Sequence, residues 1–361
     1  MNPELTLKDD EWAIFRLRML YRQYGYTYYK MSEFEEYDFY VRNKNFLDSE
    51  SILTFTGADG KLMALKPDVT LSIIKNTKDG QGALQKVYYN ENVYRPSPTS
   101  HDYREIMQVG LECIGDLDVW AMAEVVLLAA QSLETISSQY LLDLSHLGFV
   151  AGLLDQGQVK GEDRRELMEF IGKKNVPALR ESCQRLGLEE DITRDLCRLA
   201  TMYAVPAKGL EPLREMVRNR TMAWALSELE SVCTLVGEAG SHIRLDFSVV
   251  NDMNYYNGLI FRGYLPGLPC GILAGGRYDN LLKKMGKSAG AIGFAVYLDL
   301  LEQVESKGDS YDADVLLLYG PDTSPLQVAR AAGEHRRAGL SVRTERKVPP
   351  GLKFRWIKEV G

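Results

Sequence analysis

Residues 103–114 read YREIMQVGLECI, and Arg104–Ile114 within them is typical of a long β-strand. Successive side chains on a strand point to opposite faces, so this segment presents two different surfaces. The apolar surface carries Met107, Val109, Leu111 and Cys113. The other surface carries Ile106, Gln108, Gly110 and Glu112. An amide and a carboxylate on either side of a glycine suit a ligand amino group or imidazole lying on the sheet. The alternative is an ordinary solvated sheet face.

Helices and short strands alternate around this long strand. A helix is expected from the N-terminal region up to Tyr24, and another over Val119–Ser138. The apolar stripe of the first helix carries Trp12, Phe15 and Met19. Two strand-like segments flank Gly57-Ala58-Asp59-Gly60, which indicates a hairpin. This order of elements favours an α+β fold in which helices pack on an antiparallel sheet.

The later part of the chain changes character twice. Leu, Glu, Arg and Lys dominate residues 148–236, where strand signals are few, so we expect a helical insertion there. Residues 1–147 and 237–308 are then expected to form one core domain, split by the insertion. Residues 309–361 read as a short C-terminal α/β segment. Its expected elements are a strand over Ala313–Tyr319, a helix over Pro325–Ala338 and a strand over Leu340–Glu345.

Composition narrows the class of protein. The chain has 361 residues, of which 45% are apolar and 26% charged, as in soluble globular proteins. Its net charge of −7 gives no global attraction to nucleic acid. The start of the chain is polar and acidic, and the most apolar run contains Glu124, so neither a secretory signal nor a membrane span is expected. Five scattered cysteines and four histidines show no ligand spacing, so we expect no metal, and no cofactor is expected either. Without a secretory signal the cysteines are expected to be reduced thiols of a cytoplasmic protein.

Three further segments contain polar groups that are ambiguous when taken alone. Residues 66–70, KPDVT, follow the hairpin, and their proline and aspartate are normal for the start of a helix. Tyr255 and Tyr256 are adjacent on a strand-like run, where buried core tyrosines are the simplest interpretation. Residues 275–279, GGRYD, could bring N–H groups and a guanidinium to an anion, or could form a glycine turn.

In their order along the chain, these segments resemble the catalytic core of class II histidyl-tRNA synthetases. The matching segments are 34–38 (FEEYD), 66–70 (KPDVT), 93–95 (VYR), 103–112 (YREIMQVGLE), 254–258 (NYYNG), 275–279 (GGRYD) and 291–295 (AIGFA). The resemblance implies a class II synthetase-like antiparallel sheet flanked by helices, and residues 148–236 lie where this family carries a helical insertion. The family's histidine-binding positions are retained as Asp68, Thr70, Arg95, Gln108, Glu112, Tyr255 and Tyr256.

The chain departs from the synthetases at positions that serve ATP. Leu300 stands where the family has an arginine for the ATP phosphates, and Tyr297 replaces a glycine that leaves room for the nucleotide. Further departures are Asn251 or Asp252 at a second arginine, Ser32 at a proline, and the loop 96–100, PSPTS, which lacks a Glu-Arg pair. Adenylyl transfer depends on positioned positive charge, and losing one such donor typically costs about 3–4 kcal/mol. We therefore expect a retained histidine pocket beside a disabled adenylation site.

This combination resembles the regulatory subunits of ATP phosphoribosyltransferase in histidine biosynthesis. The resemblance implies a non-catalytic protein that is required by a short-form catalytic subunit and takes part in histidine feedback inhibition. It also implies self-association as a dimer within a hetero-oligomer, with neither a membrane nor tRNA as partner. The alternatives are a histidyl-tRNA synthetase with unusual motifs and a synthetase-like histidine sensor.

Overall fold

The computed structural model describes residues 9–43, 52–77, 84–96, 102–249, 255–303 and 311–360. The chain divides into two compact units, one over Asp9–Val304 and one that contains Glu305–Gly361. The larger unit carries every candidate site residue named above, and the two units are described separately below.

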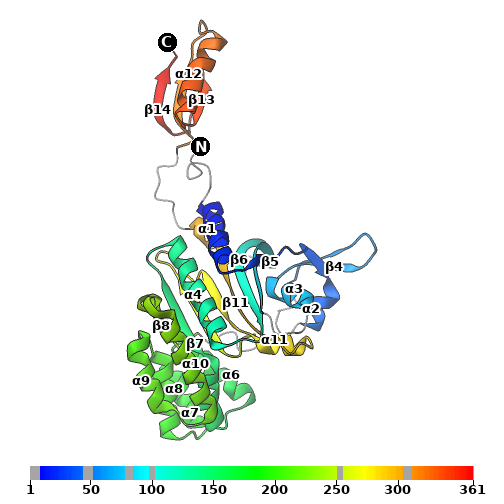
Figure 1. The fold of residues 1–361 in the computed structure, drawn as a ribbon, viewed down its shortest axis with the longest axis vertical. Coiled ribbons are helices and arrows are strands. Elements are labelled where there is room, and N and C mark those ends of the chain that lie inside the picture. The colour runs from blue at the N-terminus through cyan, green and yellow to red at the C-terminus, as the bar shows by residue number, and fades with distance from the viewer. Residues whose placement is uncertain are drawn as a thin grey trace. The chain divides into compact units, whose positions relative to one another are not determined.

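An eight-stranded sheet forms the centre of the larger unit, in the order β1-β5-β6-β11-β10-β9-β7-β8 (Figure 1). Its strands are β1 (Thr27–Tyr28), β5 (Gln85–Pro96), β6 (Tyr103–Gly115), β7 (Leu141–His146), β8 (Ile243–Leu245), β9 (Leu259–Tyr264), β10 (Leu273–Arg277) and β11 (Gly290–Tyr297). All interior pairs are antiparallel, as expected for this sheet. The outermost pairs, β1–β5 and β7–β8, are parallel, so the sheet as a whole is mixed.

One face of this sheet packs against α1 (Asp9–Gln23) and α4 (Val119–Ile136). The apolar surface predicted for β6 lies in that core, where Val109, Leu111 and Cys113 are fully buried. Among the described helices, α4 is the one long and apolar enough to cross a membrane, but most of it is buried as a core helix.

The apolar stripe predicted for α1 lies on the exposed side of the helix and not on the side that packs on the sheet. Phe15 and Met19 are each 50% exposed, whereas the buried side of the helix is formed by Ala13, Leu17 and Tyr21. The spacing of apolar residues identified the helix but not which of its faces the sheet covers.

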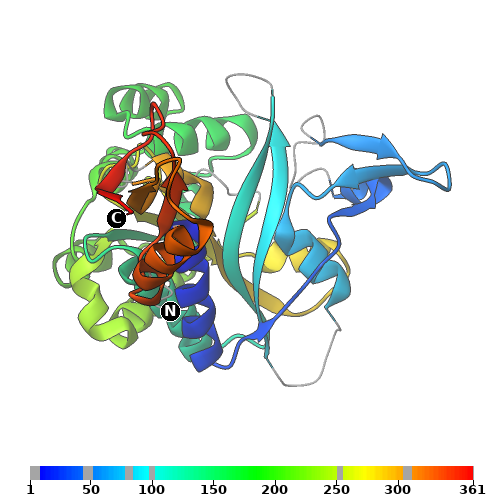
Figure 2. The same ribbon diagram turned by 90° about the horizontal axis from the view of Figure 1, so that it is seen from above.

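The opposite face of the sheet carries α3 (Val69–Asn76) and α11 (Asp279–Lys284), which share a second core with β5, β6 and β11. Beside them, β2 (Phe34–Glu36), β4 (Leu62–Leu65) and β3 (Thr54–Thr56) form a small antiparallel sheet next to α2 (Tyr37–Arg42). The predicted hairpin is the β3–β4 pair, which projects in blue in Figure 2. Its turn uses Gly60 at φ +79°, a conformation that favours glycine.

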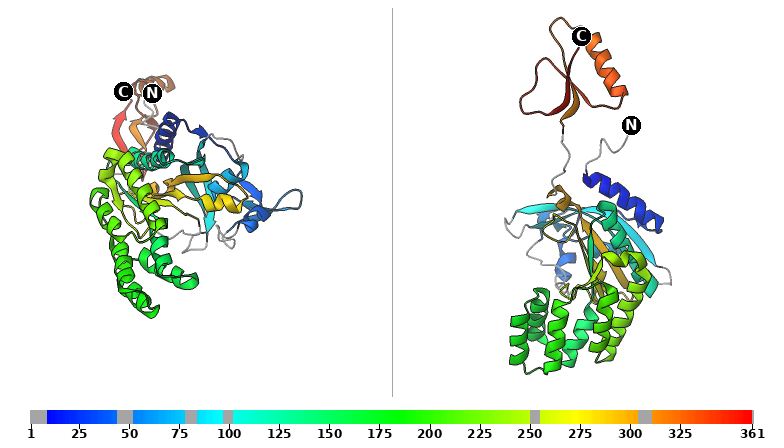
Figure 3. Two further views of the ribbon diagram at one scale, coloured as in Figure 1. Left: turned by 60° about the horizontal axis from the view of Figure 1, so that its bottom comes forward. Right: turned by 90° about the vertical axis from the view of Figure 1, so that its left-hand side faces the viewer.

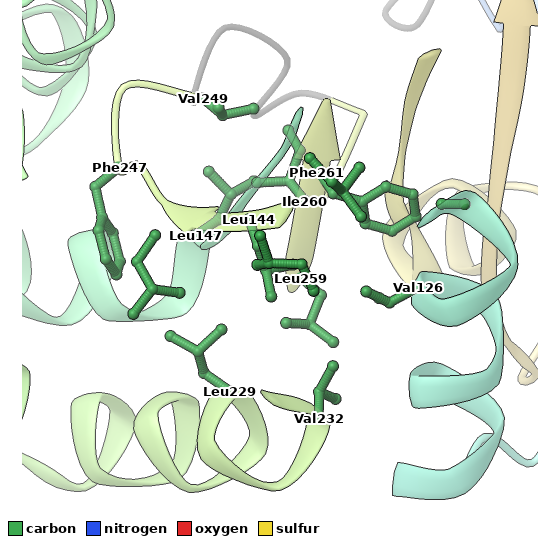
Figure 4. Close-up of a cluster of buried hydrophobic side chains, with 14 of the residues drawn as sticks. Val126, Leu144, Leu147, Leu229, Val232, Phe247, Val249, Leu259, Ile260 and Phe261 are labelled. Carbon is green, nitrogen blue, oxygen red and sulfur yellow. The ribbon is translucent and has the colours of Figure 1, made fainter. Parts of the chain in front are cut away.

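Six helices follow β7, in the region where helices were predicted. They are α5 (Leu147–Gln156), α6 (Gly161–Gly172), α7 (Val176–Arg185), α8 (Glu190–Thr201), α9 (Pro206–Met216) and α10 (Arg220–Val236). Figure 3 shows them in green as one group beside the sheet, and α10 contacts β7 while α9 contacts β8. Leu229 and Val232 of α10 lie among core residues that include Val126 of α4, Leu144 of β7 and Phe261 of β9 (Figure 4). The helical group is therefore continuous with the main core.

The smaller unit is a three-stranded parallel sheet with β12 (Ala313–Leu318) between β13 (Val342–Glu345) and β14 (Phe354–Glu359). Its helix α12 (Pro325–Arg337) begins at Ser324 with a capping box to Gln327. The strand, helix and strand predicted for this segment are confirmed, and β14 is an additional element that the sequence did not indicate.

Candidate functional site

Glu112 is the centre of a polar cluster on the sheet face covered by α3 and α11. Its side chain is buried and accepts two hydrogen bonds from hydroxyl groups. Thr70 Oγ1 donates to Glu112 Oε1 at 2.7 Å, and the Tyr278 hydroxyl donates to Glu112 Oε2. Gln108, Gly110 and Glu112 are all buried, so the solvated-face interpretation of this side of β6 is wrong.

Burial determines the protonation of Glu112. Removing the carboxylate from water raises its pKa to about 8, although both hydroxyl donors act in the opposite direction. A ligand that brings a positive charge or N–H donors would favour the ionised carboxylate. Binding of such a ligand is therefore coupled to loss of the Glu112 proton.

Two glycines make room for the side chains of this cluster. Gly293 of β11 stands directly opposite Glu112, and a Cβ at Gly293 would overlap the Glu112 carboxylate. A Cβ at Gly110 would lie 2.5 Å from the hydroxyl of Tyr89, which comes from β5. The gap over Gly110 that was expected to receive a ligand is therefore occupied by Tyr89.

Asp68 links the cluster to the start of α3. It is the N-cap of this helix and accepts a 2.8 Å hydrogen bond from the Leu71 amide, as the helix-start interpretation predicted. The Arg95 guanidinium lies 3.7 Å from the Asp68 carboxylate, and Arg95 Nε donates to the Pro67 carbonyl. Burial nevertheless raises the pKa of Asp68. The capped helix start places Thr70, two residues later, against Glu112.

Tyrosine rings line the side of the cluster next to Thr70. The Tyr255 ring centroid lies 4.8 Å from that of Tyr256 and 5.6 Å from that of Tyr278. Burial raises the pKa of Tyr255 well above its ordinary value, and a hydrogen bond with Thr70 offsets part of that rise. Tyr256 packs against Gly276, where a Cβ would lie 2.8 Å from the Tyr256 ring.

The structure thus brings together Thr70, Glu112, Tyr255 and Tyr256, and it attaches Asp68 and Arg95 through the start of α3. Gln108 is buried on the same face and stands opposite Glu91 of β5 and Tyr297 of β11. All seven predicted site residues therefore belong to one region of the sheet face or to the helix start beside it.

Sequence reasoning missed three residues of this region. Tyr278 lies in the GGRYD segment, but nothing in that segment indicates that its hydroxyl reaches β6. Tyr89 was not singled out at all. Lys66 is completely buried, with Nζ 2.6 Å from Glu91 and 3.3 Å from Glu33. A lysine is seldom buried without a partner, and these partners are distant in sequence.

The positions that depart from the synthetases are only partly within the described residues. Tyr297 ends β11 on the site face, and Leu300 packs against the main core from the 3₁₀ helix η4 (Leu298–Gln303). Ser32 accepts a hydrogen bond from the Phe34 amide. Asn251, Asp252 and residues 97–100 lie outside the described residues. No three His, Cys, Asp or Glu side chains within the described ranges gather as a metal site.

The histidyl-tRNA synthetase family model matches residues 5–301 of the chain. The ATP phosphoribosyltransferase regulatory subunit of Caldanaerobacter subterraneus is 31% identical over 307 residues, covering 81% of this chain and 79% of that protein. The chain belongs to this histidyl-tRNA synthetase-like family of regulatory subunits. The Oceanobacillus iheyensis regulatory subunit is 28% identical over 328 residues, covering 89% of this chain and 80% of its own length.

Solved structures of the family share the fold. The chain matches an ATP phosphoribosyltransferase regulatory subunit/histidyl-tRNA synthetase from Bacillus halodurans with a TM-score of 0.77 at 23% identity, covering 97% of this chain and 93% of that chain. It matches a chain of the ATP phosphoribosyl transferase HisG:HisZ complex from Thermotoga maritima with a TM-score of 0.63 at 17% identity. That match covers 80% of this chain and 97% of the other. At these identities the likeness concerns the fold.

Proposed function

We propose that this chain is the non-catalytic regulatory subunit of a cytoplasmic ATP phosphoribosyltransferase and that it binds histidine at the Glu112 cluster. A short-form catalytic subunit depends on it for activity and is inhibited through it when histidine accumulates. The observation that carries the proposal is the buried Glu112 carboxylate, which accepts hydrogen bonds from Thr70 and Tyr278. The regulatory role is supported by the family of regulatory subunits to which the chain belongs.

The cluster is chemically suited to histidine. The ligand offers an ammonium group and an imidazole N–H, and both groups form strong hydrogen bonds to a carboxylate. Asp68 and Glu112 supply the carboxylates, Gln108 supplies an amide, and the rings of Tyr255 and Tyr256 supply flat apolar walls. The seven residues Asp68, Thr70, Arg95, Gln108, Glu112, Tyr255 and Tyr256 are the proposed histidine-binding set.

In this proposal the chain is not a catalyst because two residues at the nucleotide end of the sheet do not suit ATP. Leu300 supplies no positive charge for ATP phosphates, and Tyr297 stands across from Gln108 with a bulky ring where the synthetases have a glycine. Electrostatic stabilisation is the main source of rate in adenylyl and phosphoryl transfer, so a site that lacks its arginines loses the reaction.

The proposed pairing with a catalytic subunit is supported by the structural neighbour from Thermotoga maritima, which is a chain of a HisG:HisZ complex. Feedback inhibition further requires histidine to bind the inhibited and active states of the assembly with different affinities. We propose that this chain self-associates as a dimer within that assembly and that tRNA is not among its ligands.

A reconstitution experiment tests this function. The purified chain is mixed with a short-form catalytic subunit, and ATP phosphoribosyltransferase activity is measured with and without histidine. Activity is expected only in the mixture, and histidine should suppress it. The chain alone should show no histidine-dependent ATP–pyrophosphate exchange. Robust exchange would instead identify a histidyl-tRNA synthetase, and histidine binding without any effect on the catalytic subunit would identify a separate sensor.

A further inference from the structure

A buried chain of hydrogen-bonded polar residues runs from the helical group to the sheet, close to the Glu112 cluster. His146, at the end of β7, is completely buried, and its Nδ1 accepts a 3.1 Å hydrogen bond from the Gly148 amide. Its Nε2 therefore carries the hydrogen and donates to Glu228 Oε1 at 3.0 Å. Glu228 comes from α10 and is only 6% exposed, so the last of the six helices contributes a buried carboxylate to the sheet.

Arg277 continues this chain at the end of β10. Its NH1 group donates to Glu228 Oε2 at 3.1 Å, and its Nε donates to Asp279 Oδ2 at 2.8 Å. The other oxygen of Asp279 accepts the Ala291 amide at 3.0 Å. The arginine is therefore held between α10 on one side and the start of α11 and β11 on the other. Leu229 and Val232, next to Glu228, fix α10 in the main core (Figure 4).

The residues on either side of Arg277 form a wall of the Glu112 cluster. Tyr278 follows it directly and donates its hydroxyl to Glu112, while its amide donates to the Ala291 carbonyl at 2.8 Å. The Arg277 carbonyl accepts the Asn257 amide at 2.9 Å, and Asn257 comes directly after the Tyr255-Tyr256 pair. A displacement of Arg277 would therefore shift both tyrosine-bearing segments of the cluster.

We infer that Glu228 is a positioning residue that couples helix α10 to the histidine pocket by holding Arg277, and through it Tyr278 and the Tyr255–Asn257 segment. This inference rests on the proposed histidine pocket and adds the route by which the helical group affects it. Buried ion pairs of this kind hold one geometry because removing one partner leaves the other charge buried and unpaired. A change in the position of α10 is thereby transmitted to Glu112.

Hydrogen exchange in the free protein tests the mechanical link without any ligand. Glu228→Gln replaces one of the two accepting oxygens by an NH2 donor, so the side chain can no longer accept from both His146 and Arg277. The amides of Asn257, Tyr278 and Ala291 should then exchange at least tenfold faster. The matched control is Asp195→Asn in α8, since Asp195 is 2% exposed and pairs with Arg218 within the helical group. Unchanged exchange in Glu228→Gln, or equal acceleration in Asp195→Asn, would overturn the coupling.

Histidine binding by calorimetry tests the consequence. Glu228→Gln is expected to weaken binding about tenfold, with Asp195→Asn unchanged. A Glu228→Gln/Arg277→Gln double variant should bind no more weakly than Arg277→Gln alone, because Glu228 acts through Arg277. Multiplying losses would show independent effects and contradict the inference. Glu228→Asp, which keeps the charge on a shorter side chain, gives the same pattern with smaller changes if the glutamine variant does not fold.

Failure of the pocket and failure of the coupling give different results. If the wild-type chain binds no histidine, the proposed function falls, and the exchange experiment alone decides the coupling. If the wild type binds histidine and Glu228→Gln binds it equally well, the coupling falls and the pocket stands.

Discussion

Two buried carboxyl groups on one face of the central sheet differ in how they are surrounded. Glu112 stands on β6, and the strand register places it in one row with Gly293, Gly276, Ile260 and Ser145. Asp143 lies two residues before Ser145 on β7 and so shares that face. Burial raises the pKa of Glu112 to about 8 and that of Asp143 to about 7.

The environments differ in their donors. Glu112 receives hydroxyl groups from α3 and from the residue before α11, whereas Asp143 Oδ1 and Ser145 Oγ are buried without a hydrogen-bond partner. Arg244 and Arg262 flank Asp143 across the strands and only partly offset the cost of its burial. A raised pKa is therefore common to both places. The Glu112 cluster, where we propose that a ligand binds, differs in that hydrogen-bond donors from separate elements converge on its carboxylate.

Replacing Glu112 should have the largest effect on ligand affinity. A hydrogen bond to a charged group contributes about 1.5–3 kcal/mol, so Glu112→Ala should weaken histidine binding roughly tenfold or more. The measurement is calorimetric titration of the folded variant. Asp143→Asn is the matched control, because it removes the other buried carboxyl of the same face and should leave histidine affinity unchanged. Equal losses in both variants would point to a general effect on the sheet and move the site away from Glu112.

Filling the space that the Glu112 carboxylate occupies should have the next largest effect on histidine binding. Gly293→Ala places a methyl group where that carboxylate lies, and overpacking a buried site costs about 1–3 kcal/mol. We expect a lower free energy of unfolding in denaturant titration together with weaker histidine binding. Gly320→Ala in the smaller unit is the control, since only Thr323 lies near its added Cβ, at 3.8 Å. A Gly293→Ala protein with wild-type stability and affinity would contradict the close fit.

The two carboxyls also predict how stability depends on pH. Both folded-state pKa values lie above the unfolded ones, so the folded protein binds protons more tightly and its stability falls as pH rises from about 4 to about 8. Relative to Asp143→Asn, the wild type should lose on the order of 4 kcal/mol across that range, since the pKa of Asp143 rises from 3.8 to about 7. Denaturant titrations at several pH values measure the difference. A difference independent of pH would mean that Asp143 titrates normally.

Several parts of the site could be predicted because they depend on local chemistry. Strand alternation identified both faces of β6, and the proline and aspartate of residues 66–70 identified the start of α3. Local patterns cannot show which side chain from another strand fills a space, so Tyr89 above Gly110 and the bond from Tyr278 to Glu112 were not foreseen. The same limit explains α1, where the stripe with Phe15 and Met19 is the exposed one. Strand β14 was missed because its apolar and charged residues do not alternate: Trp356 is followed by Ile357, and Lys358 by Glu359.

The smallest expected effect separates a capping carboxylate from one in the pocket. Asp118 caps α4 by accepting the Ala121 amide at 2.7 Å, as Asp68 caps α3. Asn caps helices as well as Asp, so Asp118→Asn should change the free energy of unfolding by less than about 0.5 kcal/mol and leave histidine affinity unchanged. Asp68→Asn also keeps the cap but removes the charge beside Arg95, so it should lower histidine affinity several-fold. Calorimetry on the two variants decides whether Asp68 binds ligand, because equal affinities would reduce it to a helix cap.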